Sequence, residues 1–583
     1  MANKYELLLN VLDSIISEAP TGLKKYDTST EEKTKQARAR ALIHLFLRTK
    51  FGLINFSEAE KFITDDDYDG GLDAFYIDQE NKKIYLIQSK FRTTEENFEE
   101  IPINGYELFK MDLGKILKSG SECDIQGNKY NGKILGFQRA VKEISNIGKY
   151  QYHLVFLGNI PSNLDPNKIN EVSGNVCDSV EIITGKETYN GLVLPYLQSD
   201  FYNKRDFILK IRINQNQSNR INYSVKIGDQ VININLSFIP TIELAKMMFE
   251  YKNSLLRYNP RCYVGIKKGG VNKQIEESIS NTHSNEFSLL NNGITILCND
   301  FEYNERNAEQ GTATLIITNP QIVNGGQTAF TLSRMYSGGN NELFSNKEVL
   351  VKFISLNHHQ TQEQIKLIEK ISEATNNQTP VYLSDRKSND DTLILLQRYL
   401  FENHSLLLER KTGEFFEMLN KKVISPEKII DKEQVMRLCF VISGKISEAR
   451  SYSGDKLFQQ YPITSTNFED IYNAIRFYRL VESFLEKTNN SEKKFNVKKF
   501  GYGLKYGKLA ITYALFSLFK KFPDREEKVV EFVKNKWLDF ETTVSNSPDN
   551  QGYFGDSFDY ANYYKGKNLN KDLKLYFNES VID

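Results

Sequence analysis

The chain has 583 residues, which is too many for a single hydrophobic core and predicts two to four domains. Its 75 Lys and Arg balance its 75 Asp and Glu, so no overall field draws it to nucleic acid or to an anionic membrane, and a polyanion would need a local basic groove. A hydrophobic fraction of 40% and an aromatic fraction of 12% argue against a disordered chain.

The five cysteines are scattered without a CxxC pair, which disfavours a disulfide framework or a zinc knuckle and fits a reducing compartment. The first residues lack the cationic and then apolar pattern of a signal peptide. No run reaches the length of about 18 uncharged apolar residues that a membrane span requires. We therefore expect a cytoplasmic protein that does not enter a membrane.

Apolar residues recur at helical spacing within residues 33–50, which predicts an amphipathic helix. Five cations fill much of the remaining surface of this helix: Lys33, Lys35, Arg38, Arg40 and Arg48. The simplest interpretation is a solvated cationic face, and the alternative is a helix that contacts phosphates.

The stretch DGGLDAFYIDQENKKIYLIQSKF, residues 69–91, predicts two strands joined by a polar turn. If Ile77 lies opposite Ile84, the pairing places Asp73 opposite Gln88, with β-carbons about 4.5–5.5 Å apart. Lys90 then lies diagonally, within about 7–8 Å of Asp73. The sequence therefore predicts a polar cluster on the side of the hairpin that should face the core.

A carboxylate of Asp73 and the amide oxygen of Gln88 are hard ligands that suit Mg²⁺, with Mn²⁺ as a substitute. Lys90 would orient a water or stabilise developing negative charge, and Gly70 and Gly71 would let a bulky backbone approach closely. A chance cross-strand cluster on a wet hairpin is the simpler explanation. Burial of an Asp and a Lys is costly unless they are paired or functional, which favours a catalytic site for phosphodiester hydrolysis.

Helical patterns and the expected strands 151–158 and 179–185 follow, which predicts an α/β domain over residues 1–195. Strand signals dominate residues 196–355, and helical signals dominate after residue 360. We expect a multidomain α/β chain, with a central mixed α+β domain and a helical C-terminal region. Residues 487–499 are expected to form an exposed linker between helices.

DGGLD followed by QSK resembles the restriction-endonuclease-like PD-(D/E)xK nucleases, particularly their Mrr-like branch. The resemblance implies a restriction-endonuclease-like fold for residues 1–195, with Asp73 binding the metal, Gln88 where many relatives have Glu, and Lys90 in the catalytic position. Gln88 in place of Glu removes one negative charge from the metal site that the resemblance implies. Many relatives add a helical glutamate, for which Glu31 or Glu32 could serve. Asp69 and the acidic run 65–67 are further candidates that we interpret as loop residues.

Three stretches in the middle of the chain, 289–298, 319–332 and 371–381, combine Asn, Gln and Gly with apolar residues. Turn chemistry explains each one alone. Together they offer amide donors and acceptors for a polar ligand such as a nucleotide or a nucleic-acid backbone, and residues 324–327 could form a backbone nest for a phosphate. The candidate ligand-binding residues are Asn291, Asn292, Asn324, Gly325, Gly326, Gln327, Asn376 and Gln378.

Five motifs occur in order: LLRYNPR, NNGIT, IVNGGQT, ATNNQ and ERKTG, from residue 255 to residue 413. This series resembles the AIPR family, the abortive-infection phage-resistance proteins of bacteria. The resemblance implies an AIPR domain over residues 196–420, a helical continuation over residues 421–583, and a role in phage defence. AIPR proteins often carry an N-terminal nuclease domain.

We therefore predict a Mg²⁺-dependent endonuclease of an anti-phage system, acting on nucleic acid, with DNA favoured over RNA. A phage-derived trigger or partner protein and a homodimer are the expected partners. One alternative is a catalytically degenerate module that binds nucleic acid or a nucleotide. The other is a modification-dependent restriction endonuclease of the Mrr type.

Overall fold

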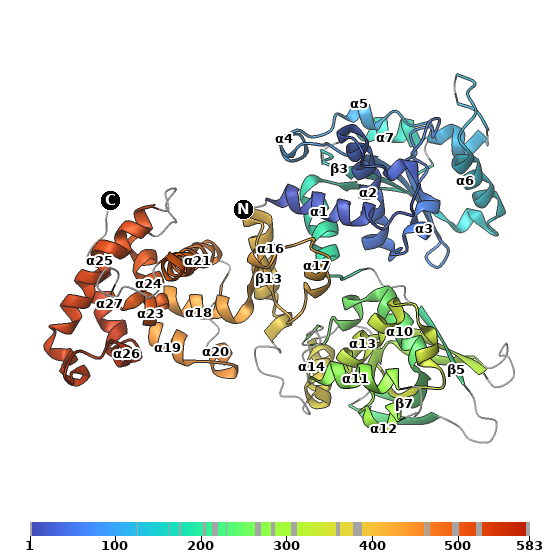
Figure 1. Cartoon of the computed structure of the whole chain (residues 1–583). Helices are drawn as coiled ribbons and strands as arrows, with labels where there is room; N and C mark the ends of the chain where they lie inside the picture. Colours follow the sequence, from blue (N-terminus) through green and yellow to red (C-terminus); the bar gives the residue numbers. More distant parts are fainter. Residues whose placement is uncertain are drawn as a thin grey trace. The chain divides into compact units, whose positions relative to one another are not determined.

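The computed structural model of the chain describes residues 3–119, 121–124, 126–161, 164–173, 176–201, 206–212, 220–228, 230–259, 261–262, 270–281, 286–304, 312–356, 362–376, 387–459, 463–464, 467–491, 501–519 and 527–578. The chain divides into two compact units (Figure 1), Met1–Thr375 with Gly413–Pro426 and Asn376–Thr412 with Glu427–Asp583. Helices and several separate sheets make it a mixed α/β multidomain protein, as predicted. No helix of the described residues is long and apolar enough to cross a membrane.

The N-terminal part of the first unit is built on a four-stranded sheet with the order β1-β2-β3-β4. Its strands are β1 (Ala74–Asp78), β2 (Lys83–Lys90), β3 (Gln151–Gly158) and β4 (Ser179–Ile183). β1 and β2 are antiparallel, whereas β2, β3 and β4 run parallel. Ile77 pairs with Ile84, so the predicted hairpin register is confirmed along the whole of β1.

Helices cover both faces of this sheet. Successive side chains of a strand point to opposite faces, and the ring of Phe75 lies 4.5 Å from that of Phe137 on one face. On the other face the ring of Tyr76 stacks 4.3 Å from that of Phe51. The helices of this part are α1 (Lys4–Ile16), α2 (Glu31–Phe51), α3 (Phe56–Ala59), α4 (Glu95–Glu99), α5 (Gly105–Leu108), α6 (Gly132–Glu143), α7 (Pro166–Ser173), α8 (Gly185–Glu187) and α9 (Leu194–Leu197).

The cations of α2 form the solvated face that the sequence suggested only in part: Lys33 is exposed, whereas two of the arginines are buried. Arg40 and Arg48 are 4% and 3% exposed, and the Arg48 guanidinium pairs with Glu18 at 2.8 Å. Arg38 is half-buried and forms two hydrogen bonds of 2.7 Å to one carboxylate. The apolar periodicity predicted the helix correctly, but long cationic side chains on a buried stripe are stable when an acid from another element neutralises them.

The central part of the first unit contains a three-stranded sheet, β5-β10-β9, and a five-stranded sheet, β11-β8-β12-β7-β6. The predominance of strands after residue 196 is therefore confirmed. The strands are β5 (Asp206–Arg212), β6 (Arg220–Ile227), β7 (Gln230–Pro240), β8 (Ile294–Cys298), β9 (Asp300–Asn304), β10 (Thr312–Thr318), β11 (Gln321–Asn324) and β12 (Glu348–Ser355). The helices are α10 (Thr241–Tyr251), α11 (Val271–Ser280), α12 (Phe287–Leu290), α13 (Gly326–Ser337) and α14 (Gln362–Asn376).

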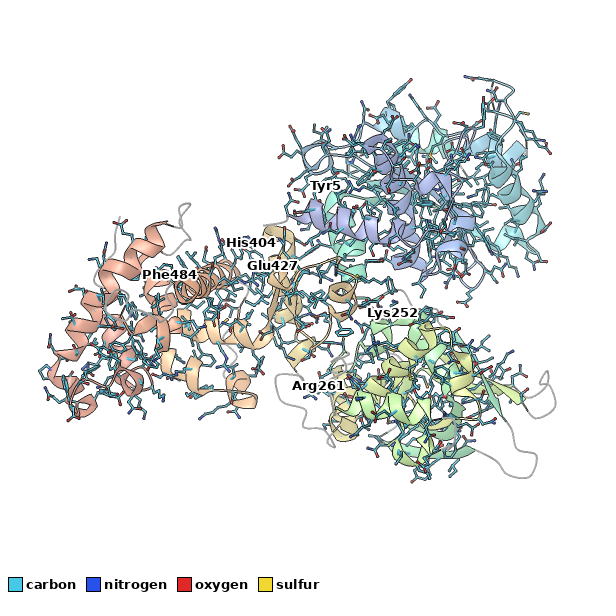
Figure 2. All side chains as sticks on the ribbon, viewed as in Figure 1. Tyr5, Lys252, Arg261, His404, Glu427 and Phe484 are labelled. Carbon is cyan, nitrogen blue, oxygen red and sulfur yellow. The ribbon has the colours of Figure 1, made fainter. Side chains whose placement is uncertain are left out.

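One short segment, Gly413–Pro426, belongs to the first unit although the residues on both sides of it belong to the second. It carries α17 (Phe416–Asn420), where Glu417 pairs with Lys252 and, at 3.2 Å, with Lys421. Lys252 is marked in Figure 2. The two compact units therefore have other bounds than the domains expected to end at residues 195 and 420, and those domain boundaries stay a prediction.

The second unit is mainly helical and has its own core, in which Trp537 is fully buried. The predicted linker 487–499 begins inside α21, which continues to Ser491, and residues 492–499 lie outside the described residues. A short parallel pair, β13 (Leu407–Glu409) and β14 (Ile429–Asp431), accompanies the helices. These are α16 (Asp391–His404), α18 (Lys432–Ile442), α19 (Ile446–Ser451), α20 (Asp455–Gln459), α21 (Phe468–Ser491), α23 (Gly503–Tyr506), α24 (Lys508–Phe519), α25 (Glu527–Ser545), α26 (Tyr560–Tyr563) and α27 (Asn568–Asn578).

Candidate functional site

Asp73 immediately precedes β1 and is 5% exposed. Its backbone N–H donates to the carbonyl of Ile87 at 3.0 Å, and its Oδ2 accepts from the backbone N–H of Ser89 at 2.6 Å. The ladder pairs begin one residue later, at Ala74, so the direct pairing of Asp73 with Gln88 is not part of the ladder. The carboxylate is instead fixed to the backbone of the residue that follows Gln88.

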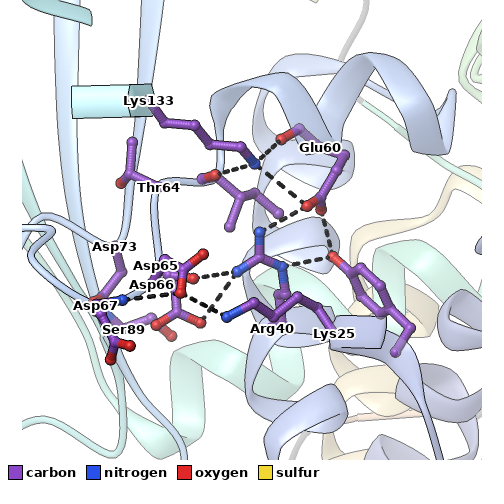
Figure 3. Close-up of polar contacts among 12 residues, drawn as sticks. Lys25, Arg40, Glu60, Thr64, Asp65, Asp66, Asp67, Asp73, Ser89 and Lys133 are labelled. Carbon is purple, nitrogen blue, oxygen red and sulfur yellow. Dashed lines mark hydrogen bonds and ion pairs between the residues drawn. The ribbon is translucent and has the colours of Figure 1, made fainter. Parts of the chain in front are cut away.

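Two further acids lie beside Asp73. Carboxylate oxygens of Asp65, Asp69 and Asp73 all lie within 4.8 Å of one another. The backbone N–H of Asp65 donates to the carbonyl of Asp73 at 3.0 Å, which folds the acidic loop back onto the start of β1. Figure 3 shows the side chains of Asp65 and Asp73. The interpretation of Asp65 and Asp69 as loop residues was correct for the backbone, but it missed that the loop returns to the site.

The pKa values of two of these carboxyls are raised. Burial raises the pKa of Asp73 to about 7; the charge of Lys90 opposes this rise, and Asp65 and Asp69 add to it. Burial likewise raises the pKa of Asp69 to about 6, against a hydrogen bond from the N–H of Gly71 and with a contribution from Asp65. Burial and neighbouring carboxylates therefore disfavour the ionised forms of Asp69 and Asp73.

Gln88 lies on β2 and is 1% exposed. Its Oε1 is buried and, among the described residues, has no hydrogen-bond partner. A buried amide oxygen without a donor loses the free energy of its hydration, so such an atom calls for an explanation such as a ligand. This atom is therefore the second observation, after the acids, that indicates a cation at this end of the hairpin.

Lys90 ends β2 and is half-buried. Its register partner on β3 is Gly158, which has a φ of +139°. A Cβ at Gly158 would lie 2.2 Å from the carbonyl oxygen of Lys90, so only glycine lets the two strands approach here. Gly158 is a site residue that was not predicted from the sequence, although a glycine at the end of a predicted strand is a recognisable signal of close approach.

The glycines before β1 serve the protein's own backbone. Gly70 and Gly71 have φ values of +64° and +76°, and a Cβ at Gly71 would lie 2.1 Å from the carbonyl oxygen of Lys110. The carbonyl of Gly70 accepts from the N–H of Asp112 at 2.8 Å. The close approach that we expected for a ligand backbone is therefore occupied by the segment 110–112.

A buried ionic network supports the acidic loop from the side of α2 (Figure 3). Arg40 donates to the backbone carbonyl of Asp65 and pairs with Glu60 at 2.6 Å. Glu60 also contacts His44 at 3.1 Å and Lys133 at 3.4 Å. Although burial opposes it, hydrogen bonds from His44 and Arg40 hold the pKa of Glu60 below its ordinary value. Arg40 also lies 3.5 Å from the Oδ2 of Asp65. It therefore fixes the backbone of the loop and neutralises Asp65 in part, while Asp69 and Asp73 have no ion pair among the described residues.

The glutamates proposed from the family pattern lie elsewhere. Glu31 and Glu32 are exposed in the first turn of α2, and Glu31 pairs with Lys35 at 2.7 Å. Neither belongs to the cluster of acids around Asp73. The acids that accompany Asp73 come from the preceding loop rather than from the helix.

The donor set fits Mg²⁺. Carboxylate oxygens of Asp65, Asp69 and Asp73 and the unpaired Oε1 of Gln88 are hard oxygen donors, and Mg²⁺ in proteins takes few side-chain ligands and keeps several waters. A cation there would also lower the raised pKa values of Asp73 and Asp69. The residues present therefore match a magnesium or manganese site.

The candidate ligand-binding residues of the central part make contacts within the protein. The Asn291 amide donates to the Thr328 hydroxyl at 3.1 Å, and the Asn324 amide donates to a carbonyl of α14 at 2.8 Å. The Gln327 amide donates to the carbonyl of Cys262 at 2.6 Å and accepts from Asn272 at 3.2 Å. These bonds join segments that are distant in sequence, and ligand binding by these residues stays a prediction.

The other candidate ligand-binding residues are two glycines at the start of α13, two asparagines and Gln378. Gly325 has a φ of +83° and precedes α13, whose first residue is Gly326. A Cβ at Gly325 would lie 2.8 Å from the Ile294 side chain, so the two motifs pack directly. Asn292 is exposed, and Asn376 ends α14. Gln378 lies outside the described residues.

Comparison with known proteins gives one result. The family model described as AIPR protein matches residues 256–551, just over half of the chain. No curated protein and no solved structure matches the chain. The matched residues begin within the LLRYNPR motif and include the other four motifs, whereas Asp73, Gln88 and Lys90 lie before the match.

Proposed function

The chain belongs to the AIPR family, and from that premise we propose that it is a phage-defence protein whose N-terminal α/β domain is a metal-dependent endonuclease. The AIPR family supports the defence role. The nuclease assignment depends on residues outside the family match and is argued from their geometry and from the resemblance to PD-(D/E)xK nucleases. We infer a restriction-endonuclease-like domain over the N-terminal sheet.

The observation that carries the proposal is a cluster of three carboxylates at one end of the β1–β2 hairpin, of which only Asp65 has an ion pair among the described residues. Three carboxylates lie within 4.8 Å of one another, the Gln88 Oε1 is buried without a partner, and Lys90 is on the same strand. Structural ion pairs usually balance their charges, whereas a site that binds a cation leaves them unbalanced. Here the guanidinium of Arg40 is bonded to a backbone carbonyl and to Glu60, and it reaches only one of the three acids, Asp65, at 3.5 Å.

Asp73, with Asp65, Asp69 and Gln88, would hold the cation. A bound Mg²⁺ supplies charge that polarises a phosphoryl oxygen and acidifies water. Asp73 is held by the Ser89 N–H, so its carboxylate keeps one orientation without a side-chain partner. The Lys90 ammonium would orient the attacking water or stabilise negative charge as it develops on the phosphate. Gly158 positions Lys90 by allowing β3 to lie against its carbonyl.

The substrate follows from this chemistry as a phosphodiester, and we propose nucleic acid, with DNA favoured over RNA. The chain has no net charge, so substrate must be held by local contacts rather than by a global field. A phage-derived trigger or partner protein, a homodimer and a cytoplasmic location belong to the same proposal. Two hairpin sites in a dimer would suit cleavage of both strands.

A cleavage panel tests the proposal. Single- and double-stranded DNA and RNA are incubated with the full-length protein and Mg²⁺ or Mn²⁺, with and without phage lysate, and compared with EDTA. We expect metal-dependent cleavage by the wild type and its loss in Lys90→Ala. The matched control is Lys83→Ala, the same change at the other end of β2, which should cleave normally. Absence of cleavage under every condition, or equal cleavage by Lys90→Ala, would refute the nuclease.

A second candidate is a defence module that binds nucleic acid or a nucleotide without cleaving it. One observation favours it: Asp73, with a pKa raised to about 7, is partly protonated near neutral pH, and a protonated carboxyl is a poor ligand. Under this alternative, phage protection survives Lys90→Ala while the panel shows no cleavage. The Mrr-type alternative adds one arm to the panel, in which only methylated or otherwise modified DNA is cut.

A further inference from the structure

The second unit contains a cavity of about 300 Å³ that is remote in sequence from the N-terminal site. Its walls come from α18, α19, α21 and α27 and from the junction of α23 with α24. The volume is at the lower end of the range for small-molecule pockets, about 300–1,000 Å³. The cavity is therefore large enough for a compact ligand rather than a macromolecule.

The charge of this cavity is one-sided. Its described lining includes four cations, Arg437, Arg450, Lys505 and Lys508, and no acid. Glu482 neutralises Lys508 from outside the lining, at 2.9 Å. The Arg450 guanidinium has no hydrogen bond or ion pair among the described residues, and Arg450 and Lys505 are exposed. Uncompensated cations that share one cavity create a local positive potential that attracts an anion.

Backbone donors add to this potential. The N-terminus of α24 lines the cavity through Lys508, Leu509 and Ala510, and this helix has 12 residues. The first N–H groups of a helix have no partner within it and carry the positive end of its dipole, which suits a phosphate. Gln434 also lines the cavity, and its Nε2 is a buried donor without a partner among the described residues.

The walls are held in place before any ligand arrives. Arg437 donates to the carbonyls of Ala449 and Tyr452 at 2.7 and 3.0 Å, which fixes its guanidinium at the end of α19. A Cβ at Gly507 would lie 2.5 Å from the ring of Tyr564, so glycine lets α24 begin against this buried ring. Donors fixed in advance lose little conformational entropy on binding.

We propose that this cavity binds a nucleotide, with its phosphate at the N-terminus of α24 between Arg450 and Lys505. The rings of Tyr478 and Tyr506 line the same cavity, with the ammonium groups of Lys508 and Lys505 at 5.8 and 4.8 Å from their centroids. A base would stack on the ring surface that these cations leave open. The small volume favours a single nucleotide over a nucleic-acid strand, and the absence of acids from the described lining favours a phosphate ester over a neutral nucleoside. The inference is independent of the proposed nuclease, because it uses no residue of the N-terminal domain.

Calorimetric titration of the full-length chain in EDTA tests the inference, since chelation removes the contribution of a metal at the N-terminal site. The probes are AMP, ATP, adenosine, inorganic phosphate and a short single-stranded DNA. We expect AMP or ATP to bind more tightly than adenosine or inorganic phosphate. The double variant Arg450→Gln/Lys505→Gln should bind at least about tenfold more weakly.

The matched control is Lys536→Gln, an exposed cation of α25 that does not line the cavity, and its affinity should equal that of the wild type. Arg450 makes no contact that folding requires among the described residues, and a circular-dichroism melt checks that the double variant folds. No nucleotide binding, or equal binding by the double variant, would overturn the inference. Tighter binding of the DNA strand than of either nucleotide would also overturn it, in favour of a nucleic-acid contact.

Discussion

Two clusters of buried charge in the first unit differ in how they are balanced. Around α17, Glu417 contacts Lys252 and Lys421, and Glu18 contacts Lys421 and Arg48, so the charges alternate in sign. Although burial opposes it, these two lysines lower the pKa of Glu417 to about 2. At the start of β1 three acids, Asp65, Asp69 and Asp73, lie together with a single ion pair among the described residues, from Arg40 to Asp65 at 3.5 Å, and the pKa of Asp73 is raised to about 7.

The difference in charge balance between the two clusters indicates a structural role for one and a functional role for the other. A cluster of alternating charges satisfies itself and stabilises the packing of distant segments, as the one around Glu417 does for the segment 413–426. A cluster of like charges destabilises the fold unless something else binds, and such clusters are retained at sites that need them. The α17 cluster therefore stabilises the first unit, whereas for the β1 cluster we propose a role in binding a ligand.

The largest expected effect is on stability at the balanced cluster. Glu417→Gln leaves Lys252 buried without a carboxylate, and breaking a buried pair in this way costs about 3–5 kcal/mol. Urea unfolding should show this loss in the free energy of unfolding. The control is Glu80→Gln, an exposed glutamate in the β1–β2 turn, which should change it by less than about 0.5 kcal/mol. A loss at Glu417 no greater than at Glu80 would contradict the structural role.

The next effect is on activity at the unbalanced cluster. Asp73→Asn keeps the size of the side chain and an acceptor for the Ser89 N–H, and it removes one of three like charges. We expect cleavage to fall by at least about 100-fold, while the free energy of unfolding stays equal to that of the wild type or rises. Initial cleavage rates and urea unfolding measure the two effects. If Asp73→Asn is inactive because it is unfolded, the β1 cluster has a structural role, which would contradict the prediction.

The third effect tests whether Gly158 is needed to position Lys90. Gly158→Ala would force a Cβ against the Lys90 carbonyl and should destabilise the domain by about 1–3 kcal/mol and reduce cleavage. Gly136→Ala, in α6 with nothing within 4 Å of the added carbon, should raise stability by about 0.5–1 kcal/mol. Thermal melts and cleavage rates compare the two. The interpretation is wrong if both alanines behave alike.

The smallest effect is on pH dependence, where the two clusters act with opposite signs. The raised pKa of Asp73 contributes stability that is present below its unfolded pKa, near 4, and is lost as pH rises through about 7. The lowered pKa of Glu417 contributes stability that is present above about 4.5 and is lost as pH falls toward 2. In EDTA, melts at about pH 5 and pH 8 should show wild type losing stability relative to Asp73→Asn at the higher pH. Parallel changes in the two proteins would contradict the shift at Asp73.

Much of the hairpin could be predicted because local rules decide it. The alternation of apolar residues and the position of the polar turn predict the pairing of Ile77 with Ile84, which is confirmed; the ladder extends to Asp78 and Lys83, so the turn itself has four residues, 79–82. The interpretation of Asp65 and Asp69 was incomplete because their approach depends on the bridge between Ile63 and Ala74, a contact that no local periodicity encodes. Likewise the burial of Arg40 depends on Glu60, an acid of another element.

For the Asn and Gln motifs, the family could be predicted from the sequence but the roles of the single residues could not. Their order along the chain predicted the AIPR family, and the family match confirms it. Their individual roles could not be predicted, because an amide serves a ligand or a neighbouring carbonyl equally well. The partner of Gln327 is the carbonyl of Cys262, 65 residues earlier, and only the fold brings the two together.

Titration of Mn²⁺ into the metal-free, full-length protein, followed by calorimetry, tests the central claim most directly. We expect saturable binding at the β1 cluster in the wild type, abolished in Asp73→Asn and retained in Lys83→Ala. Binding heats that are the same in the wild type and in Asp73→Asn would contradict the claim that the acids at the start of β1 hold a divalent cation.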